Sequence, residues 1–309
     1  MNVDDKTSKL NLETYISATR LPFSSASVLP VIMVAVYIYR NDYNAFNIIN
    51  TVLSIFGVLF LHLAANTLND FFDWDESDEI NSNASPFNGG SRYVLGEKNF
   101  DQIRFLYVSV LLLTAALISG VLLIFNNRPL VLVFGLIGAL FGILYSMEPF
   151  SFQKKGFGEL LIFLAFGPVL TMGAGYGISG ELYLIYALLG ITFGLVTTAI
   201  IFINEIPDYE ADLQTNKRNL IVKFGKSSGK TFVGFTFLMF FISIITLVYA
   251  KVLPAKILYI AIFLPLTVHI LFTLKKHLNN TRKLINAQKN TIIFQILSSI
   301  MIILIIGFR

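Results

Sequence analysis

Long apolar segments alternate with short polar ones along the whole chain. Nine apolar segments of 18 to 22 residues are separated by turn-prone or charged stretches such as YRNDYN, NNRP, SGE and KVLPAK. A helix of about 20 residues crosses the hydrocarbon layer of a bilayer, and the segments lack the alternation of a membrane barrel. The pattern predicts an all-α membrane protein with nine transmembrane helices, at approximately residues 22–39, 48–68, 104–125, 129–147, 158–179, 183–204, 230–250, 254–274 and 290–308.

The composition agrees with this pattern and excludes several classes of protein. Of the 309 residues, 55% are hydrophobic and 14% are charged, whereas a soluble domain has about 25% charged residues. The sequence contains no cysteine, which excludes disulfides and thiolate chemistry. Its polar start has neither the apolar core nor the cleavage site of a signal peptide. We expect a single integral-membrane domain over residues 1–309 that lies in lipid and binds no nucleic acid.

Lys and Arg are distributed unevenly between the two sets of connecting segments. With the N-terminus inside, 18 of the 23 basic residues fall on the inside, and the side with more Lys and Arg in its loops is the cytoplasmic one. The sequence therefore predicts an N-in/C-out protein of the cell membrane. Two inside loops, at about 70–103 and 205–229, are long and carry 12 of the 19 acidic residues. Long loops in compact proteins are usually functional.

The first acidic segment, NTLNDFFDWDESDE, directly follows the second apolar segment. At 100° per residue, Asn66, Asn69, Asp70 and Asp73 fall within a sector of about 100°. They would form one polar face at the end of a helix. Such a face makes a poor lipid surface, so it indicates either a functional site or a solvated acidic helix end.

The sixth apolar segment ends in a similar way, in INEIPDYEADLQTNKRNL. Both segments have an Asn, an Asp four residues later, and a second Asp four or five residues further on. Both follow an even-numbered span on the same side, four spans apart. This favours pseudo-repeated four-helix units around a central cavity, with a ninth helix added. The residues that repeat are Asn69, Asp73 and Asp78 in the first segment and Asn204, Asp208 and Asp212 in the second.

Two clusters of oxygen ligands favour a hard cation, Mg²⁺ or Ca²⁺. Mg²⁺ usually takes one or two carboxylates and completes its shell with water and substrate phosphates, so two facing clusters would clamp a diphosphate. Nearby cations would neutralise the charge of a leaving diphosphate, although positive-inside bias alone also explains basic residues there. We prefer that bias for the basic residues between 275 and 283. The candidates for the clamp are Arg20, Arg92, Lys154, Lys155, Lys217 and Arg218.

Aromatic and imidazole side chains near these motifs are weaker candidates. His62 and His269 fall within spans, where a lone His usually forms a hydrogen bond between helices. Some aromatic residues are placed to line a tunnel for an apolar chain or to shield a carbocation with their ring faces. These are Phe71, Phe72, Tyr145, Phe150 and Tyr209.

These motifs resemble the UbiA superfamily of membrane prenyltransferases. The resemblance rests on NDFFD after the second span, YSMEPFSFQKKGFGELLIFLAFGP across the fourth and fifth, and NEIPDYEADLQTNKRNL after the sixth, and it covers nearly the whole chain. PFNGGSR and NEIPDYEAD are most similar to the branch that prenylates 1,4-dihydroxy-2-naphthoate in menaquinone synthesis. The resemblance implies a cytoplasm-facing cavity in which two Mg²⁺ ions bridge a prenyl diphosphate, and transfer of the prenyl group to an aromatic ring.

The resemblance also implies roles for individual residues. One metal site would comprise Asn69, Asp73 and Asp78, and the other Asn204, Asp208 and Asp212. Residues that would contact the diphosphate are Arg20, Lys155, Lys217 and Arg218, with Arg92 added because it lies beside the first motif. Tyr145 would lie near the allylic carbon and act in catalysis together with Asp73, Asp208 and Asp212.

The sequence departs from the family pattern at two places. Ser77 occupies the position of the third acid of the first motif, so Asp70, Asp78 or Glu79 would take its role. The usual Gly-Lys-Arg-Thr reads NKRN at residues 216–219.

Three alternatives share these features. The same scaffold can serve another acceptor, such as 4-hydroxybenzoate, homogentisate, haem or a glycerol phosphate. It can also cyclise a terpene, with an alkene of the substrate as the nucleophile. A transporter is the third alternative, but it predicts charges at mid-membrane depth beside broken helices, whereas these acids follow the ends of spans.

Overall fold

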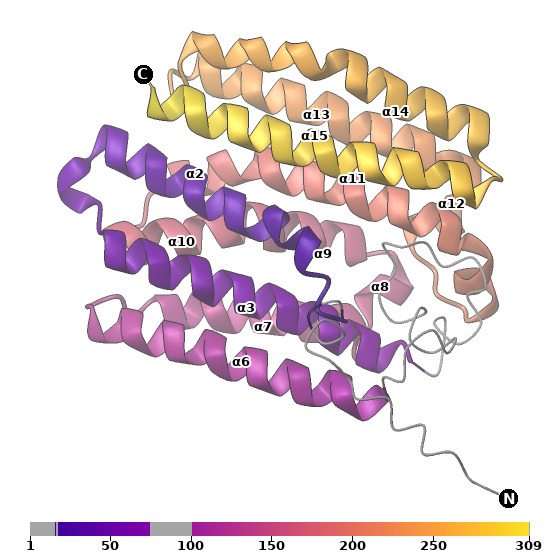
Figure 1. Cartoon of the computed structure of the whole chain (residues 1–309), viewed down its shortest axis with the longest axis horizontal. Helices are drawn as coiled ribbons and strands as arrows, with labels where there is room; N and C mark the ends of the chain where they lie inside the picture. Colours follow the sequence, from indigo (N-terminus) through magenta and orange to yellow (C-terminus); the bar gives the residue numbers. More distant parts are fainter. Residues whose placement is uncertain (1–15, 17, 75–100, 309) are drawn as a thin grey trace, which may run out of the picture.

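The computed structural model describes residues 16, 18–74 and 101–308, which form a bundle of helices aligned along one long axis (Figure 1). Within these residues there is no β-strand. In chain order the elements are η1 (Leu21–Ser24), α2 (Ser25–Asn41), η2 (Tyr43–Ala45), α3 (Ile48–Phe72), α6 (Gln102–Phe125), α7 (Val131–Ser146), α8 (Phe152–Lys155), α9 (Gly158–Leu164), η3 (Ala165–Val169), α10 (Leu170–Ser179), α11 (Leu184–Gln214), α12 (Leu220–Phe224), η4 (Lys226–Ser228), α13 (Gly229–Tyr249), η5 (Ala255–Phe263), α14 (Leu264–His277) and α15 (Thr281–Gly307).

All nine apolar segments appear as helical regions, but they differ in length. Eight regions of the described residues are long and apolar enough to cross a membrane. The fourth, α7, is apolar but has only 16 residues. It ends at Ser146 because Pro149 follows closely, and a residue before proline avoids the helical conformation. The structure therefore does not confirm nine membrane-length helices.

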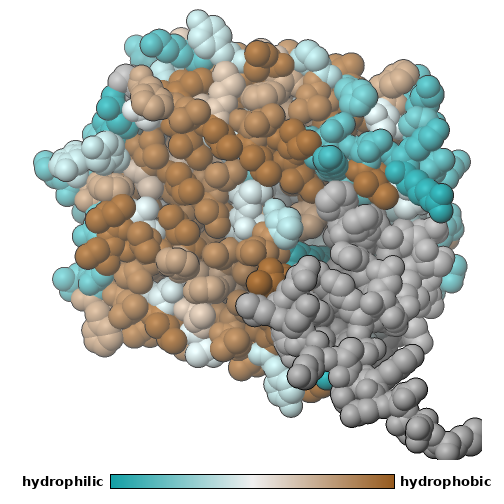
Figure 2. Space-filling model, in the orientation of Figure 1, coloured by the Kyte–Doolittle hydropathy of each residue, from teal (hydrophilic) through white to brown (hydrophobic). Residues whose placement is uncertain are grey.

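The surface of the molecule suits a lipid environment. Figure 2 shows hydrophobic side chains over most of the visible face, with polar side chains gathered toward its two ends. Large apolar side chains such as Leu111, Phe125 and Ile262 are more than two thirds exposed. Water disfavours such a surface, whereas hydrocarbon does not. The chain is an integral membrane protein.

The helix that carries the second acidic motif is longer than expected. The sequence predicted a loop from residue 205, but α11 continues through Pro207 to Gln214. The proline removes only one backbone donor and is tolerated where neighbouring helices enclose the site, and Pro207 is buried. Asn204, Asp208 and Asp212 therefore lie about one turn apart along one side of the helix, because residues four apart are neighbours.

The fifth helical region is broken where it meets α11. At η3 the backbone of Gly167 leaves the helical conformation, with φ −113° and ψ −107°, and Pro168 follows. A Cβ atom on Gly190 would lie 2.5 Å from the Gly167 carbonyl oxygen, and one on Gly194 would lie 2.5 Å from the Phe163 carbonyl oxygen. Glycine thus lets the two backbones touch. The broken turn Ala165–Val169 contains no acidic residue, unlike the break expected of a transporter.

One large cavity lies in the bundle, but it is not shared equally between two repeated units. Its lining comes from η1, α2, α3, α6, α7, α9, η3, α10 and α11, and no described residue after Asn204 contributes. In the last three regions, the ring of Phe294 contacts Phe237, Phe240 and Phe263, with centroids 5.0, 5.3 and 6.1 Å apart. Aromatic packing fills the C-terminal part of the bundle, so the expected central cavity is instead confined to the earlier helices.

Candidate functional site

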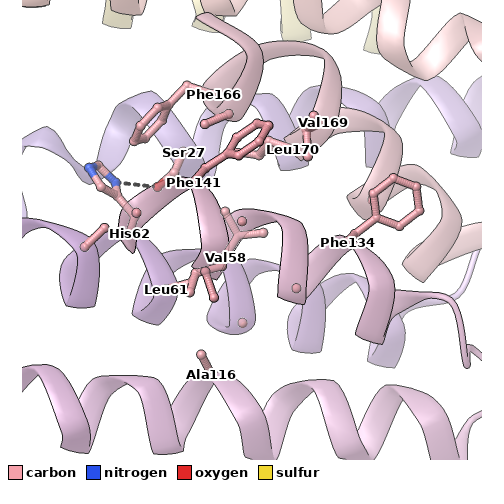
Figure 3. Close-up of a pocket in the computed structure, with 18 of the residues that line it drawn as sticks. Ser27, Val58, Leu61, His62, Ala116, Phe134, Phe141, Phe166, Val169 and Leu170 are labelled. Atoms are coloured by element: carbon pink, nitrogen blue, oxygen red, sulfur yellow. Dashed lines mark hydrogen bonds between the residues drawn. The ribbon is translucent and has the colours of Figure 1, made fainter. Parts of the chain in front are cut away.

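The cavity has a polar end and an apolar body. Its volume is about 530 Å³. Figure 3 shows apolar side chains of α3 (Val58 and Leu61) and α7 (Phe134 and Phe141) around it, with Ala116 of α6 below. Polar residues that line it include Arg20, Asn66, Asn69, Tyr145 and Asn204.

Asn69 is oriented by three acceptors at the end of α3. Its Nδ2 donates to Asp73 Oδ2 at 3.0 Å, to Ser146 Oγ at 3.1 Å and to Gln153 Oε1 at 3.4 Å. A carboxylate only accepts hydrogen bonds, so the amide nitrogen must face Asp73. Among the described residues no donor reaches Asn69 Oδ1, and Asn69 lines the cavity. The carbonyl oxygen is thus available to a cation there.

Asp73 follows α3 directly and is held from two sides. Gln153 Nε2 donates to Asp73 Oδ1 at 2.8 Å, and Lys217 Nζ donates to Asp73 Oδ2 at 3.3 Å. Gln153 belongs to the short helix α8, and Ser146 ends α7. Sequence reasoning did not single out Gln153 or Ser146, although both lie in the YSMEPFSFQKK stretch that carries the resemblance.

Lys217 joins the two acidic motifs. Its Nζ lies 3.3 Å from Asp73 Oδ2 and 3.9 Å from Asp212 Oδ1. Both carboxylates are buried, and a buried charge needs a partner because desolvation is costly. The tertiary structure therefore brings residues 73 and 212 to one shared cation, as two facing clusters require.

The loop that carries Lys217 explains why Asn216 can replace the family's usual glycine. Asn216 has φ 57°, in the left-handed region. The Lys217 amide donates to the Asp212 carbonyl at 2.8 Å, and the Asn216 amide donates to the Leu213 carbonyl at 3.4 Å. This is a Schellman motif, in which Gly is preferred at the left-handed position and Asn is also used. Asn216 thus serves where the family has glycine.

Asn219 can likewise replace the family's usual threonine. Its Oδ1 accepts from the Val222 amide at 2.8 Å and caps the start of α12, a role that Thr and Asn both fill. Its Nδ2 donates to Asp212 Oδ2 at 2.8 Å. Glu159 Oε1 holds the same turn, because it accepts from the Leu220 amide at 2.7 Å. The loop is therefore fixed to the second motif.

Asn204 is positioned by a residue far along the chain. Gln288 of α15 donates from Nε2 to Asn204 Oδ1 at 3.0 Å. Gln288 Oε1 is buried and has no hydrogen-bond partner among the described residues. Asp208, one turn after Asn204 on α11, is half-buried. No sequence signal marked Gln288, because residue 288 lies outside every motif.

Arg20 and Tyr145 both line the cavity. Arg20 precedes η1 in the left-handed conformation, with φ 56°. Its guanidinium forms an ion pair with Asp70, whose side chain is fully buried. Asp70 therefore anchors Arg20 at the cavity wall.

The other predicted site residues lie elsewhere. Lys155 is exposed and its Nζ donates to the Pro149 carbonyl at 2.6 Å. Arg218 is exposed and lines a separate cavity of about 300 Å³. Neither residue lines the large cavity, and the same is true of Asp73, Asp208, Asp212 and Lys217. Asp78 and Arg92 lie outside the described residues, as does Glu79.

The fold and motifs agree with comparisons to known proteins. The 1,4-dihydroxy-2-naphthoate octaprenyltransferase of Bacillus subtilis is 23% identical over 235 residues, which cover 74% of this chain and 72% of that protein. The enzyme of the same description in Haemophilus influenzae is 23% identical over 203 residues, or 63% of each chain. The UbiA prenyltransferase domain-containing protein 1 of Dictyostelium discoideum is 26% identical, over 68% of this chain and 63% of that protein. The chain thus spans less than two thirds of the last two relatives.

Solved structures show the same fold. A UbiA homologue from Archaeoglobus fulgidus bound to DMAPP and Mg²⁺ superposes with a TM-score of 0.64 at 18% identity, over 94% of this chain and 99% of that chain. The apo structure of a UbiA homologue from Aeropyrum pernix gives a TM-score of 0.66 at 15% identity, over 91% and 97%. Residues 27–298 match the family described as the UbiA prenyltransferase family. With this match over most of its length, the chain belongs to the UbiA prenyltransferase family.

Proposed function

We propose that this protein transfers a polyprenyl group from a prenyl diphosphate to an aromatic acceptor, with the help of Mg²⁺. The acceptor we propose is 1,4-dihydroxy-2-naphthoate, in menaquinone biosynthesis. The observation that carries the proposal is the cavity, whose polar end holds Asn69, Asn204 and Arg20 while its body is apolar. A prenyl diphosphate has the same division into a charged head and an apolar tail. The names of several relatives support this acceptor.

The residues present fit Mg²⁺. Within the described part of the chain, no three His, Asp or Glu side chains converge to hold a metal by themselves. Mg²⁺ needs no such cage, because it commonly binds one or two carboxylates and completes its shell with substrate phosphates. The available carbonyl oxygen of Asn69 and the carboxylate of Asp73 would hold one ion, and Asn204, Asp208 and Asp212 the other. The DMAPP and Mg²⁺ bound to a homologue from Archaeoglobus fulgidus support Mg²⁺ and a prenyl diphosphate as the ligands.

The protein residues would bind and orient the reactants. When bound, Mg²⁺ supplies positive charge that stabilises the leaving diphosphate. Lys217 and Arg20 add fixed positive charge, and preorganised charge of this kind needs no rearrangement during the reaction. The allylic C–O bond breaks with its electron pair on the diphosphate, and a ring carbon of the acceptor forms the new bond. With dihydroxynaphthoate as acceptor, the ring also loses CO₂.

The proposed orientation places the polar end of the cavity at the cytoplasmic face of the cell membrane. Most Lys and Arg residues occur in the connecting segments on that side, which include the segment with Lys217. A soluble diphosphate head would reach the site from the cytoplasm, while the tail would lie among the helices.

The acceptor is tested by incubating membranes that contain the protein with a labelled prenyl diphosphate and Mg²⁺. We expect a prenylated lipid only when dihydroxynaphthoate is added. A product with 4-hydroxybenzoate instead would assign a different acceptor. A cyclic product formed without any acceptor would replace the transferase with a terpene cyclase.

The apolar wall should select the length of the prenyl chain. Gly120 of α6 lines the cavity, and a Cβ atom added there meets no heavy atom within 4 Å. Gly120→Phe should therefore project a ring into the cavity and lower kcat/KM by about tenfold or more for long prenyl diphosphates, but less for short ones. Rates with donors of two lengths measure the effect.

The matched control for Gly120→Phe is Gly234→Phe on α13, which lies outside the cavity and near only Leu271. It adds the same ring to another helix and should leave the length preference unchanged. An equal loss with long and short donors in Gly120→Phe would show that this wall does not hold the tail.

The contact between Gln288 and Asn204 should affect metal use. Gln288→Leu removes the donor to Asn204 Oδ1, and loss of a residue that orients a metal ligand usually costs about 10- to 100-fold in metal affinity or activity. We expect the Mg²⁺ concentration for half-maximal rate to rise about tenfold. The rate is measured across a Mg²⁺ titration.

Gln295→Leu is the control for Gln288→Leu, because Gln295 is also a buried amide of α15 but bonds to Ser25 of α2. Both variants lose a buried polar contact between helices. An equal shift of the Mg²⁺ dependence in both would assign the Gln288 contact a purely structural role.

A further inference from the structure

A histidine lies in the cavity wall at membrane depth. His62 of α3 and Ser27 of α2 both line the cavity, and His62 Nδ1 lies 2.9 Å from Ser27 Oγ. Figure 3 shows this pair at one end of the group of apolar side chains. The ring of Phe166 meets the imidazole edge-on, with centroids 4.7 Å apart. The bond confirms the expected link between helices, but it uses only one of the two ring nitrogens.

The contacts of Ser27 favour one tautomer of His62. Ser27 Oγ also donates to the carbonyl of Ser24 at 3.0 Å. A carbonyl only accepts, and a serine hydroxyl has one hydrogen. When that hydrogen is donated to Ser24, Ser27 Oγ accepts from Nδ1–H of His62. In the neutral imidazole the other nitrogen, Nε2, is then an acceptor without a hydrogen.

Nε2 of His62 is open to the cavity. Among the described residues His62 has no other hydrogen-bond partner, and Nε2 is not among the fully enclosed atoms that lack one. His62, Asn66 and Asn69 follow one another at spacings of four and three residues and line the same cavity. His62 therefore lies about 10 Å further along α3 than Asn69, beyond the end where the diphosphate would bind.

A cavity ligand that offers a donor is favoured next to His62. An acceptor that is left without a donor in an apolar site loses free energy relative to water. A prenyl tail has no hydrogen-bond donor, whereas a hydroxylated aromatic ring has one. We propose that His62 Nε2 accepts a hydrogen bond from a ring hydroxyl of the aromatic acceptor and acts as the base that activates it. This inference rests on the proposed prenyl transfer and restricts its acceptor to aromatic rings with a free hydroxyl.

The step balances without a further reactant. The hydroxyl proton moves to Nε2, and the oxygen electrons raise the electron density of the ring carbon that attacks. That carbon bonds to the allylic carbon while the C–O bond to the diphosphate breaks with its electron pair. The ring becomes aromatic again when the attacked carbon loses CO₂, or loses its proton to the released diphosphate, and the imidazolium returns the proton to the oxygen.

The test compares His62→Asn with the wild-type chain, using the purified full-length protein with a prenyl diphosphate and Mg²⁺. The Asn amide can still donate to Ser27 from near the Nδ1 position, but nothing replaces Nε2. We expect kcat/KM for the hydroxylated acceptor to fall about 100-fold, with the KM for prenyl diphosphate unchanged. The wild type should discriminate between this acceptor and its O-methyl ether, and His62→Asn should lose that discrimination.

Two further variants separate this role from a structural one. His62→Gln places an amide oxygen near the Nε2 position, so it should recover acceptor affinity, seen as KM, without recovering kcat. Ser27→Ala removes the hydrogen bond that fixes the tautomer of His62 but keeps the imidazole. It should therefore lower the rate less than His62→Asn does. If the wild type is active and His62→Asn keeps both the rate and the discrimination, the role assigned to His62 is wrong, while the proposed prenyl transfer is unaffected. A wild type inactive with every hydroxylated aromatic acceptor overturns the proposed function and the role of His62 together.

Discussion

Replacing Asp73 with asparagine is expected to lower prenyl transfer by about 100-fold or more while the chain stays folded. The asparagine keeps an oxygen that can accept from Gln153 Nε2, which now lies 2.8 Å from Asp73 Oδ1. It removes the negative charge that faces Lys217 and would hold Mg²⁺. The turnover number of purified protein at saturating substrates measures the effect. Asp208→Asn should have a similar effect at the second motif.

Asp42→Asn is the matched control for the Asp73 variant. Asp42 is an exposed acid that follows α2 and caps η2, where its carboxylate accepts from the Ala45 amide. Asparagine can keep that cap, so activity should remain near that of the wild type. Near-normal turnover in Asp73→Asn would refute the assignment of Asp73 to the metal clamp.

Replacing Lys217 with methionine is expected to reduce both activity and stability. The change leaves the buried carboxylates of Asp73 and Asp212 without their shared cation. Breaking a buried ion pair in this way costs about 3–5 kcal/mol. Because Mg²⁺ binds only the folded arrangement, it should restore part of the lost stability. The melting temperature of Lys217→Met should therefore rise more with added Mg²⁺ than that of the wild type, although turnover stays low.

Two variants test this explanation of Lys217. Lys217→Arg keeps the charge and should retain the melting temperature better than methionine does. Lys230→Met removes an exposed lysine at the start of α13. Because surface ion pairs contribute little to stability, it should change neither the melting temperature nor the turnover. If Lys217→Met melts at the wild-type temperature without Mg²⁺, Lys217 does not neutralise the two carboxylates.

Much of the local structure was predictable from the order of residues. The apolar segments appear as helices because a backbone in lipid must satisfy its own hydrogen bonds. The spacing of Asn and Asp placed Asn69 beside Asp73 at the end of one helix and Asn204, Asp208 and Asp212 along one side of another, since residues four apart share a helix face. Positions 216 and 219 kept the local roles of the family residues, because Asn is accepted both at a left-handed helix end and at a helix start.

Other features depended on contacts between distant segments. Lys217 and Arg218 are adjacent cations, and sequence reasoning gave both the same role. After the left-handed turn at Asn216, Lys217 points to the two motifs and Arg218 lies exposed in a separate cavity. Gln153 and Gln288 also hold motif residues from elements far along the chain.

The sequence by itself determined the membrane class, the helical regions and the two acidic motifs, because these depend on local composition and spacing. Only the tertiary structure decided that Lys217 joins the motifs, that the cavity avoids the aromatic C-terminal helices, and that His62 presents one nitrogen to it. The physical reason is that a side chain's role depends on its distance to partners on other helices. Such distances depend on how the helices pack against one another, which the spacing of residues along a single helix does not specify.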